Sequence, residues 1–233
     1  MGKRIIQQAR GKGSLTYRTR KKAFRISVSY PTTEGEGRVE KLMNVACYSA
    51  PIAKIRLNRK IFYNIAADKV YEGQEIMIGK KATICPGNIV FLRDIPIGTA
   101  VFSLETVPYT GPKLVRGSGL SARVIKKDSK GIYVKLPSKK EKIFNPNARA
   151  TIGIVSASGR YEKPILKAGK KFHMVKAIGG RIYPRTSAVK MNVVDHPFGS
   201  GRGKRIKSKI PKRNAPPGRK VGLLSPKRTG KRK

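Results

Sequence analysis

The chain has 233 residues, is 39% hydrophobic and carries 53 Lys and Arg against 12 Asp and Glu, which gives a formal net charge of +41. Charge of this size disfavours a compact monomer until a polyanion neutralises it, so the composition indicates nucleic acid first and an anionic membrane surface second. No apolar run approaches the roughly 18 residues of a membrane span, and we therefore expect no membrane partner.

The first segment of the chain is strongly basic. Residues 1–25 hold nine Lys and Arg, no acidic residue and several glycines, without a sustained hydrophobic period. A segment of this kind has no core of its own, so we expect a basic arm over residues 1–37 that becomes ordered on a polyanion. Its candidate RNA-binding residues are Arg20, Lys21, Lys22 and Arg25. A solubilising tail is the alternative, although solubility does not require an acid-free run.

The middle of the chain predicts two groups of short β-strands. Stretches rich in Val, Ile, Tyr and Phe are separated by Gly, Pro, Asn and Asp, which is typical of small antiparallel barrels or sandwiches. The first group comprises residues 38–49, 52–57, 60–67 and 74–79, and the second comprises 99–106, 121–127, 131–137, 142–145 and 150–157. A segment punctuated by Pro and Gly, residues 85–99, divides the groups and favours two barrels over one large sheet.

Local patterns refine this prediction. Ile132, Val134 and Leu136 alternate with polar or amphipathic residues, so one face of their strand is expected to point inward. Gly131 ends the sequence KKDSKG and can supply the positive φ of a hairpin turn. A short helix is expected near residues 163–170. The two cysteines lie in apolar stretches, at 47 and 85, and are expected to be buried free thiols.

The end of the chain is again basic. Residues 202–233 hold fourteen Lys and Arg and no acidic residue, and strand patterns thin out after about residue 176. We therefore expect a second basic arm over residues 177–233. Glycines at 199, 201 and 203 would let the main chain approach RNA closely, or alternatively form a flexible hinge. The candidate nucleic-acid-binding residues of this arm are the cations Arg202, Lys204, Arg205, Lys212, Arg213, Arg219 and Lys220.

His196 raises the question of catalysis, because it follows Asp195 and precedes a proline. An orienting carboxylate normally reaches the far nitrogen of a catalytic histidine from elsewhere in the fold, and no nucleophile is identifiable nearby. A structural role or an RNA contact is therefore favoured. Surrounding phosphates would favour the charged ring, which donates from both nitrogens. No P-loop, nucleophile elbow or metal-ligand spacing is present, so we expect no cofactor beyond magnesium associated with RNA.

Three ordered motifs carry a family resemblance. The sequence MNVVDHPFGSG, residues 191–201, resembles the Met-Asn-Pro-Val-Asp-His-Pro signature of the universal large-subunit ribosomal protein number two family. The segment CPGNIVFLRDIPIGT is similar to that family's segment between its barrels, and NAPPGRKVGLL resembles the C-terminal signature of its archaeal and eukaryotic branch. The chain departs from the signature at four positions, where Ser187, Ala188, Lys190 and Val193 replace Arg, Gly, Ala and Pro.

The resemblance implies an all-β protein with an OB-fold barrel over residues 38–92 and an SH3-like barrel over 93–176, between basic arms at 1–37 and 177–233. It implies binding of large-subunit ribosomal RNA, with the C-terminal arm reaching toward the peptidyl transferase region. The implied RNA-binding residues are Arg116 in the second barrel and Asn192, His196 and Gly199 in the signature motif. The implied partners are ribosomal RNA and other large-subunit ribosomal proteins of the cytoplasmic ribosome, and contact with the tRNA region or the small subunit is left open.

We thus expect a structural ribosomal protein, not an enzyme and not a homo-oligomer. Two alternatives remain at this point. One is a general nucleic-acid-coating protein, which the charge alone would equally support. The other is an RNA-acting enzyme that uses His196.

Overall fold

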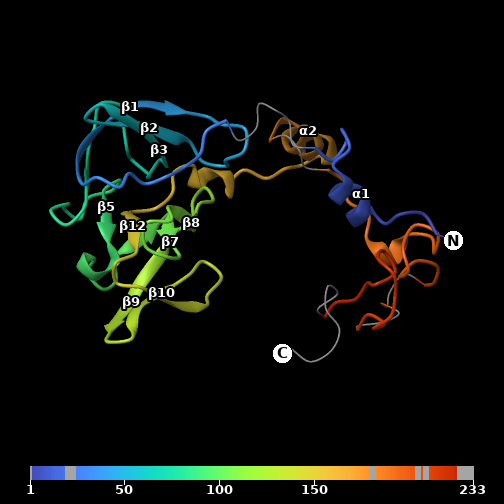
Figure 1. The fold of residues 1–233 in the computed structure, drawn as a ribbon. Coiled ribbons are helices and arrows are strands. Elements are labelled where there is room, and N and C mark those ends of the chain that lie inside the picture. Colours follow the sequence, from blue (N-terminus) through green and yellow to red (C-terminus); the bar gives the residue numbers. More distant parts are fainter. Residues whose placement is uncertain (1, 19–24, 179–181, 203–205, 207–209, 225–233) are drawn as a thin grey trace. The chain divides into compact units, whose positions relative to one another are not determined.

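The structure, a computed structural model, describes residues 2–18, 25–178, 182–202, 206 and 210–224. The chain forms two compact units, of which one comprises Lys21–Lys167 and the other combines Met1–Arg20 with Ala168–Lys233 (Figure 1). Among the described residues, twelve strands and only two α-helices occur, and the predicted all-β class is confirmed.

The strands all lie in the unit Lys21–Lys167. In chain order they are β1 (Gly35–Met43), β2 (Ile52–Leu57), β3 (Lys60–Ile65), β4 (Glu75–Ile78), β5 (Ile89–Phe91), β6 (Ala100–Phe102), β7 (Leu104–Glu105), β8 (Pro112–Leu114), β9 (Ala122–Asp128), β10 (Gly131–Lys135), β11 (Glu141–Phe144) and β12 (Arg149–Ile152). Short 3-10 turns occur at Leu92–Asp94, Ser158–Arg160 and Ala188–Lys190.

Ten of these strands pair in the order β11-β10-β9-β6-β12-β5-β4-β1-β2-β3, and β7 pairs with β8. The pairs are antiparallel except β4 with β5, which meet in parallel at Ile78 and Ile89. The described strands β11 and β3 stand at the two ends of this order. The assignment of the two strand groups to OB-fold and SH3-like barrels therefore rests on the family resemblance. Figure 1 shows β1, β2 and β3 together and β7 to β10 together within this unit.

The predicted hairpin between β9 and β10 is confirmed. Gly131 pairs with Asp128 and has a φ of 136°, a backbone conformation that favours glycine. A Cβ at this position would also lie 2.6 Å from the carbonyl oxygen of Phe144 on β11. The predicted alternation holds as well, because Ile132 and Val134 are buried while Lys135 is exposed. Gly131 is therefore required by both the turn and its neighbouring strand.

Three hydrophobic clusters form the core of this unit. The first draws its buried residues from 30–89 and the second from 90–152. The third joins the two strand groups, because it packs Ile52 and Ile65 against Phe102 and Val155. The change from one core to the next falls between Ile89 and Val90, close to the predicted division at residue 92.

The segment before β1 packs into the core, although the sequence placed it in a basic arm. Val28 and Tyr30 are buried. The Tyr30 hydroxyl donates to the Ser103 carbonyl oxygen at 2.7 Å and lies 2.7 Å from the Thr151 hydroxyl. Burial raises the pKa of Tyr30 well above its usual range, so the phenol stays neutral. The apolar and aromatic residues of this short segment thus belong to the β unit.

Two other expectations are wrong. Cys47 is half-buried and Cys85 is exposed, so the prediction that both thiols are buried fails. Cys85 precedes the turn at Pro86 and Gly87 that leads into β5, and turns of this kind lie at the surface. The second α-helix begins at Ala168, so it overlaps the expected helix near 163–170 by three residues only.

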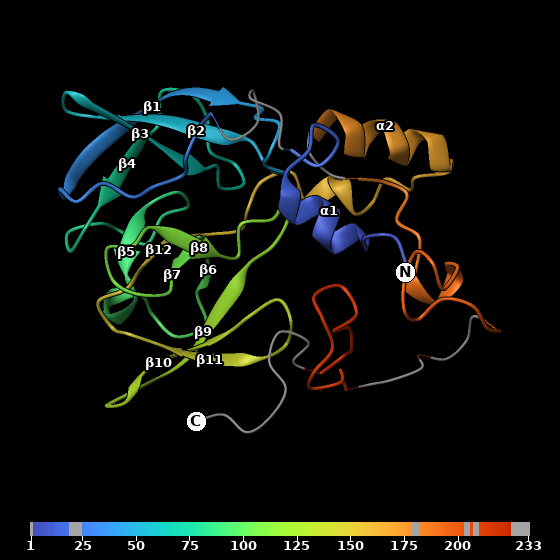
Figure 2. The same ribbon diagram turned by 45° about the vertical axis from the view of Figure 1, so that its right-hand side comes forward.

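The second unit contains both α-helices, α1 (Ile6–Lys12) and α2 (Ala168–Ile178), as Figure 2 shows. The backbone N–H of Lys3 donates to the Val194 carbonyl oxygen at 2.8 Å and so joins the two segments of this unit. Among its described residues only Gly199 and Pro211 are buried. The two segments of this unit, which the sequence placed largely in separate arms, therefore lie together, and their described residues form none of the three hydrophobic clusters.

Candidate nucleic-acid interface

A closed loop forms around the MNVVDHPFGSG motif. The Asn192 carbonyl oxygen accepts from the backbone N–H groups of Asp195 at 3.0 Å and His196 at 3.1 Å. Gly199 N–H donates to the His196 carbonyl oxygen at 2.8 Å, and Ser200 N–H to the Met191 carbonyl oxygen at 3.0 Å. These backbone hydrogen bonds hold the motif in a defined turn.

Gly199 lets the chain close on itself. A Cβ here would overlap the carbonyl oxygens of Met191 and Asn192. The sequence explained this glycine by close approach to RNA, but the structure shows that the neighbouring backbone already fills the space. Gly199 is buried and shapes the loop, and its predicted contact with RNA stays a prediction.

Val193 replaces the proline of the family signature and adds a hydrogen bond. Its N–H donates to the Ser200 hydroxyl oxygen at 3.0 Å, a bond that proline lacks the hydrogen to make. The neighbouring altered positions form the 3-10 turn Ala188–Lys190. The departures from the signature are therefore accommodated within one continuous turn structure.

The surroundings of the His196 ring favour its neutral form. The Phe198 N–H donates to His196 Nδ1 at 3.1 Å, and the two ring centroids lie 5.0 Å apart. Burial lowers the pKa of His196 below its ordinary value of 6.5. The ring is therefore neutral near pH 7 and carries its proton on Nε2. The expectation of a charged ring that donates from both nitrogens applies to His196 surrounded by RNA phosphates, and it stays a prediction.

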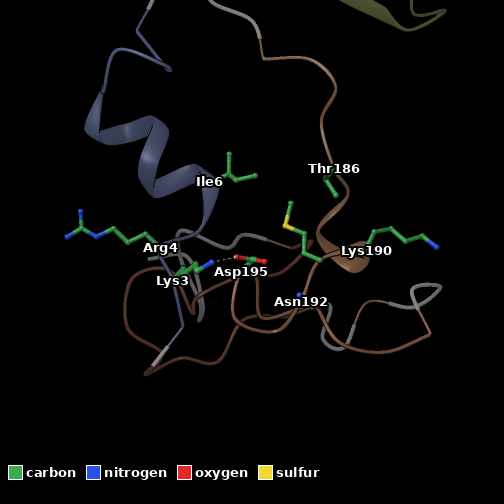
Figure 3. Close-up of a pocket in the computed structure, with 8 residues that line it drawn as sticks. Lys3, Arg4, Ile6, Thr186, Lys190, Asn192 and Asp195 are labelled. Atoms are coloured by element: carbon green, nitrogen blue, oxygen red, sulfur yellow. Dashed lines mark ion pairs between the residues drawn. The ribbon is translucent and has the colours of Figure 1, made fainter. Parts of the chain in front are cut away.

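Asp195 does not act as the orienter of His196. Its carboxylate instead pairs with Lys3 at 3.8 Å, an exposed contact that Figure 3 shows across the pocket. Exposed pairs of this kind stabilise little. Since Nδ1 of His196 is occupied by a backbone N–H, the Asp-His pair of the sequence forms no catalytic couple.

Two pockets adjoin the loop. One, of about 430 Å³, is lined by Lys3, Arg4, Lys190, Asn192 and Asp195 among others, and Figure 3 shows Thr186 and Lys190 on the side opposite Lys3 and Arg4. The other, of about 650 Å³, is lined by side chains that include Arg10, Tyr17, Val175, Tyr183, Arg185 and His196. Ile6, Thr186 and Met191 line both pockets.

The predicted RNA-binding residues are distributed unevenly. The loop brings together Asn192, which is exposed, His196, which is half-buried, and Gly199. Lys220 is half-buried, and the other predicted RNA-binding cations that are described in this unit are exposed, namely Arg202, Lys212, Arg213 and Arg219. Arg25 and Arg116 are exposed in the unit Lys21–Lys167. Arg20, Lys21, Lys22, Lys204 and Arg205 lie outside the described residues.

Sequence reasoning missed the side chains that line the pockets. Lys3, Arg4 and Arg10 lie in the basic first segment, but nothing local singles them out from their neighbours. Tyr17 and Tyr183 each stand near cations in the sequence, and aromatic residues interleaved with Lys and Arg are a signal for nucleic-acid binding that could have found them.

The charge of the unit is almost entirely positive. Its two segments hold 26 Lys and Arg and one acidic residue, Asp195. The Lys3–Asp195 contact is the only ion pair among its described residues. Within the described part of the chain, no cluster of three or more His, Cys, Asp or Glu side chains could hold a metal ion. No described helix is long and apolar enough to cross a bilayer.

A β-sheet unit combined with an almost acid-free cationic unit is typical of the class of basic proteins that bind polyanions. The family model for the C-terminal domain of ribosomal proteins L2 matches residues 85–217, which is more than half of the chain. Proteins named large ribosomal subunit protein uL2 from Archaeoglobus fulgidus, Methanococcoides burtonii and Methanothrix thermoacetophila are 40%, 41% and 42% identical, each with full coverage of both chains. The chain belongs to the uL2 family, in its archaeal type.

Proposed function

We propose that the chain is a structural constituent of the large ribosomal subunit that binds large-subunit ribosomal RNA, supports assembly of the subunit and holds RNA near the peptidyl transferase centre. Its partners are then that RNA and neighbouring large-subunit proteins, and its place is the cytoplasmic ribosome. The family and the names of its relatives support the ribosomal role. The observation that carries RNA binding is the cationic unit, with 26 Lys and Arg and one acidic residue.

Phosphate contacts supply the binding energy in this proposal. Exposed cations such as Arg202, Arg213 and Arg219 have no carboxylate partner among the described ion pairs, so they are available to RNA. Each phosphate that a cation neutralises releases condensed counterions. Arg can also hold phosphate with two hydrogen bonds or stack on a base, which suits folded RNA with closely spaced phosphates.

The division of labour along the chain is part of the proposal. Residues 38–92 and 93–176 each present an RNA-binding β domain, with Arg116 among the contacts of the second. Residues 1–37, in which Arg25 lies, and residues 177–233 add basic segments that reach between RNA helices. The change of core at Ile89 and Val90 supports the boundary between the two domains. His196 offers RNA one donor, the Nε2–H.

Competition binding tests the proposal against general nucleic-acid coating. The full-length chain is mixed with archaeal large-subunit ribosomal RNA, and bulk duplex DNA is added at matched phosphate concentration and ionic strength. We expect the ribosomal RNA complex to persist and to give a discrete footprint. If bulk DNA displaces the ribosomal RNA in proportion to its phosphate concentration, and the RNA shows no footprint, the chain is a general nucleic-acid-coating protein instead.

Two substitutions test the enzyme alternative. His196→Asn places an oxygen near the position of Nδ1 and keeps an acceptor for the Phe198 N–H, whereas His196→Gln keeps the longer reach of Nε2. We expect ribosomes reconstituted with either variant to assemble somewhat less well and to retain peptide transfer. A loss of roughly 10⁴-fold or more in transfer, in subunits with a normal RNA footprint, would restore a catalytic role for His196.

A further inference from the structure

Two adjoining pockets in the unit that combines Met1–Arg20 with Ala168–Lys233 differ in chemistry but share a wall. We propose that together they hold one unpaired RNA nucleotide, with its base in the larger pocket and its phosphate in the smaller. This inference rests on the proposed RNA-binding function and adds to it a specific site, composed of residues from both ends of the chain.

The larger pocket suits a planar, partly polar ring. Its volume of about 650 Å³ lies in the range of ligand pockets, roughly 300–1,000 Å³. Tyr17 and Tyr183 are half-buried in its wall, and Val175 adds apolar surface. Nucleobases stack on aromatic rings and on the planar guanidinium of Arg, and this stacking accepts any base. Lys171 Nζ lies over one face of the Tyr183 ring, 5.8 Å from its centre, which leaves the opposite face for a base.

Hydrogen-bonding groups in the same pocket match the edge of a base. The Gln7 amide and the Thr186 hydroxyl both donate and accept hydrogen bonds. The His196 ring lines the pocket with Nδ1 already occupied by the Phe198 N–H, so its Nε2–H is the group left to donate. The pocket therefore combines a stacking surface with a few polar groups, as a site for a heteroaromatic ring requires.

The smaller pocket suits a phosphate. Lys3, Arg4 and Lys190 line it against a single carboxylate, Asp195, so its lining carries a net positive charge (Figure 3). Lys3 meets Asp195 at 3.8 Å with its side chain 75% exposed, so an incoming phosphate can compete for it. The Asn192 amide supplies a neutral donor to the same pocket.

The shared wall links the two parts of the ligand. Both pockets are lined by Ile6, Thr186 and Met191. A ligand that occupies both pockets must therefore carry a planar ring and an anionic group a short distance apart. A nucleotide has this form. A base inside a duplex is stacked between its neighbours and cannot enter, so the nucleotide must be unpaired. An acidic segment of a neighbouring protein with an aromatic side chain is the competing occupant, but a unit with 26 cations favours the polyanion.

Binding of archaeal large-subunit ribosomal RNA by the full-length chain tests this inference. Tyr17→Ala and Tyr183→Ala should each weaken binding by about 5- to 150-fold, the effect of removing one base–aromatic stack. Because no charge is lost, the dependence of affinity on salt should not change. Tyr17→Phe and Tyr183→Phe should bind like the parent chain, because the ring remains. Tyr71→Ala, at a side chain 65% exposed in the other unit, is the matched control and should have no effect.

The phosphate half has a different signature. Arg4→Gln and Lys190→Gln should each reduce the slope of log affinity against log salt by about 0.7, the value for one contact with a single strand.

The inference is overturned if the alanine variants at both tyrosines bind like the parent chain. It is also overturned if the phenylalanine variants lose as much affinity as the alanine variants. Normal RNA affinity with loss of a neighbouring protein from the assembled subunit would assign the pockets to a protein segment. Failure of the parent chain itself to prefer ribosomal RNA over DNA would instead refute the proposed function.

Discussion

The imidazole of His196 couples the loop at residues 191–200 to pH. Its Nδ1 accepts the Phe198 N–H, and burial lowers its pKa below 6.5. A histidine in the unfolded chain titrates near 6.5, so just below that pH the unfolded state binds more protons than the folded state. The contribution of His196 to stability is therefore full above about pH 6.5 and is lost as the pH falls below it.

We predict that an NMR titration of the His196 ring in the free chain has its midpoint below 6.5. Hydrogen-exchange protection of the Phe198 amide, corrected for the intrinsic pH dependence, should decline as the ring gains a proton on Nδ1. His196→Asn keeps an acceptor that does not titrate, so protection at Phe198 should then be independent of pH in this range. A midpoint above 6.5 would mean that another group stabilises the charged ring.

At the scale of elements, a buried ion pair joins β7 to β12. Glu105 and Arg149 have side chains that are 0% and 4% exposed, and Glu105 Oε1 lies 2.9 Å from Arg149 Nη2. The Glu105 carboxylate also accepts from the Arg149 backbone N–H at 2.9 Å and the Gly111 N–H at 3.0 Å. Arg149 in turn donates to the Pro31 carbonyl oxygen and lies over the rings of Tyr30 and Tyr109. One pair thus organises a loop, two strands and the segment before β1.

Glu105→Ala should lower the free energy of unfolding by about 3–5 kcal/mol, because it leaves the Arg149 charge buried without its partner. Denaturant unfolding of the full-length chain measures the change. The matched control is Asp128→Ala, which removes an exposed carboxylate that pairs with Lys126 and accepts from the Ser129 N–H, and it should lower the free energy of unfolding by much less than Glu105→Ala does. Equal effects of the two substitutions would show that the buried pair has no special role.

The segment that carries Val28 and Tyr30 should be required by the β unit. A fragment spanning 25–167 contains all the residues of the three cores, whereas a fragment spanning 38–167 lacks Val28 and Tyr30. We expect the shorter fragment to be less stable by at least about 3 kcal/mol, from two lost buried side chains. Urea unfolding of the two fragments measures the difference. Equal midpoints would show that the β unit does not require residues 25–37, as the basic-arm prediction implies.

The sequence predicted these elements where local pattern and packing agree. The stretch 52–57 forms β2 with the expected bounds, and the turn at Gly131 has the expected conformation. The prediction from sequence was wrong where a short apolar run lies among basic residues, as at Val28 and Tyr30. Burial of Tyr30 depends on partners more than seventy residues away in the sequence. The ring state of His196 was also unpredictable, since it depends on one backbone hydrogen bond within a turn.

At the scale of the whole molecule, the distribution of charge sets how RNA affinity should respond to salt. Deleting residues 202–233 removes fourteen cations and no acidic residue. Each lost phosphate contact reduces the salt slope by about 0.7–0.9, so we expect a decrease of several units for large-subunit ribosomal RNA. Titrations between about 50 and 200 mM salt measure it.

The same deletion provides its own folding control. No residue of the three hydrophobic cores lies in 202–233, so the unfolding midpoint of the β unit should be unchanged. An unaltered salt slope would show that these cations do not lie on phosphates. The charge of this segment was evident from composition, but its association with the first segment was not, because contacts between the ends of a chain leave no local pattern.

The hydrogen bond between Lys3 and Val194 also has a consequence for the order of biosynthesis. At about 5–20 residues per second, roughly 10–40 s pass between synthesis of the two residues. The α1 helix, with seven residues and no buried side chain, is too short to be stable alone during that interval. The β unit is complete before the loop at 191–200 is made. The pockets between the two ends therefore close last, and a nascent chain interrupted before this loop cannot form them.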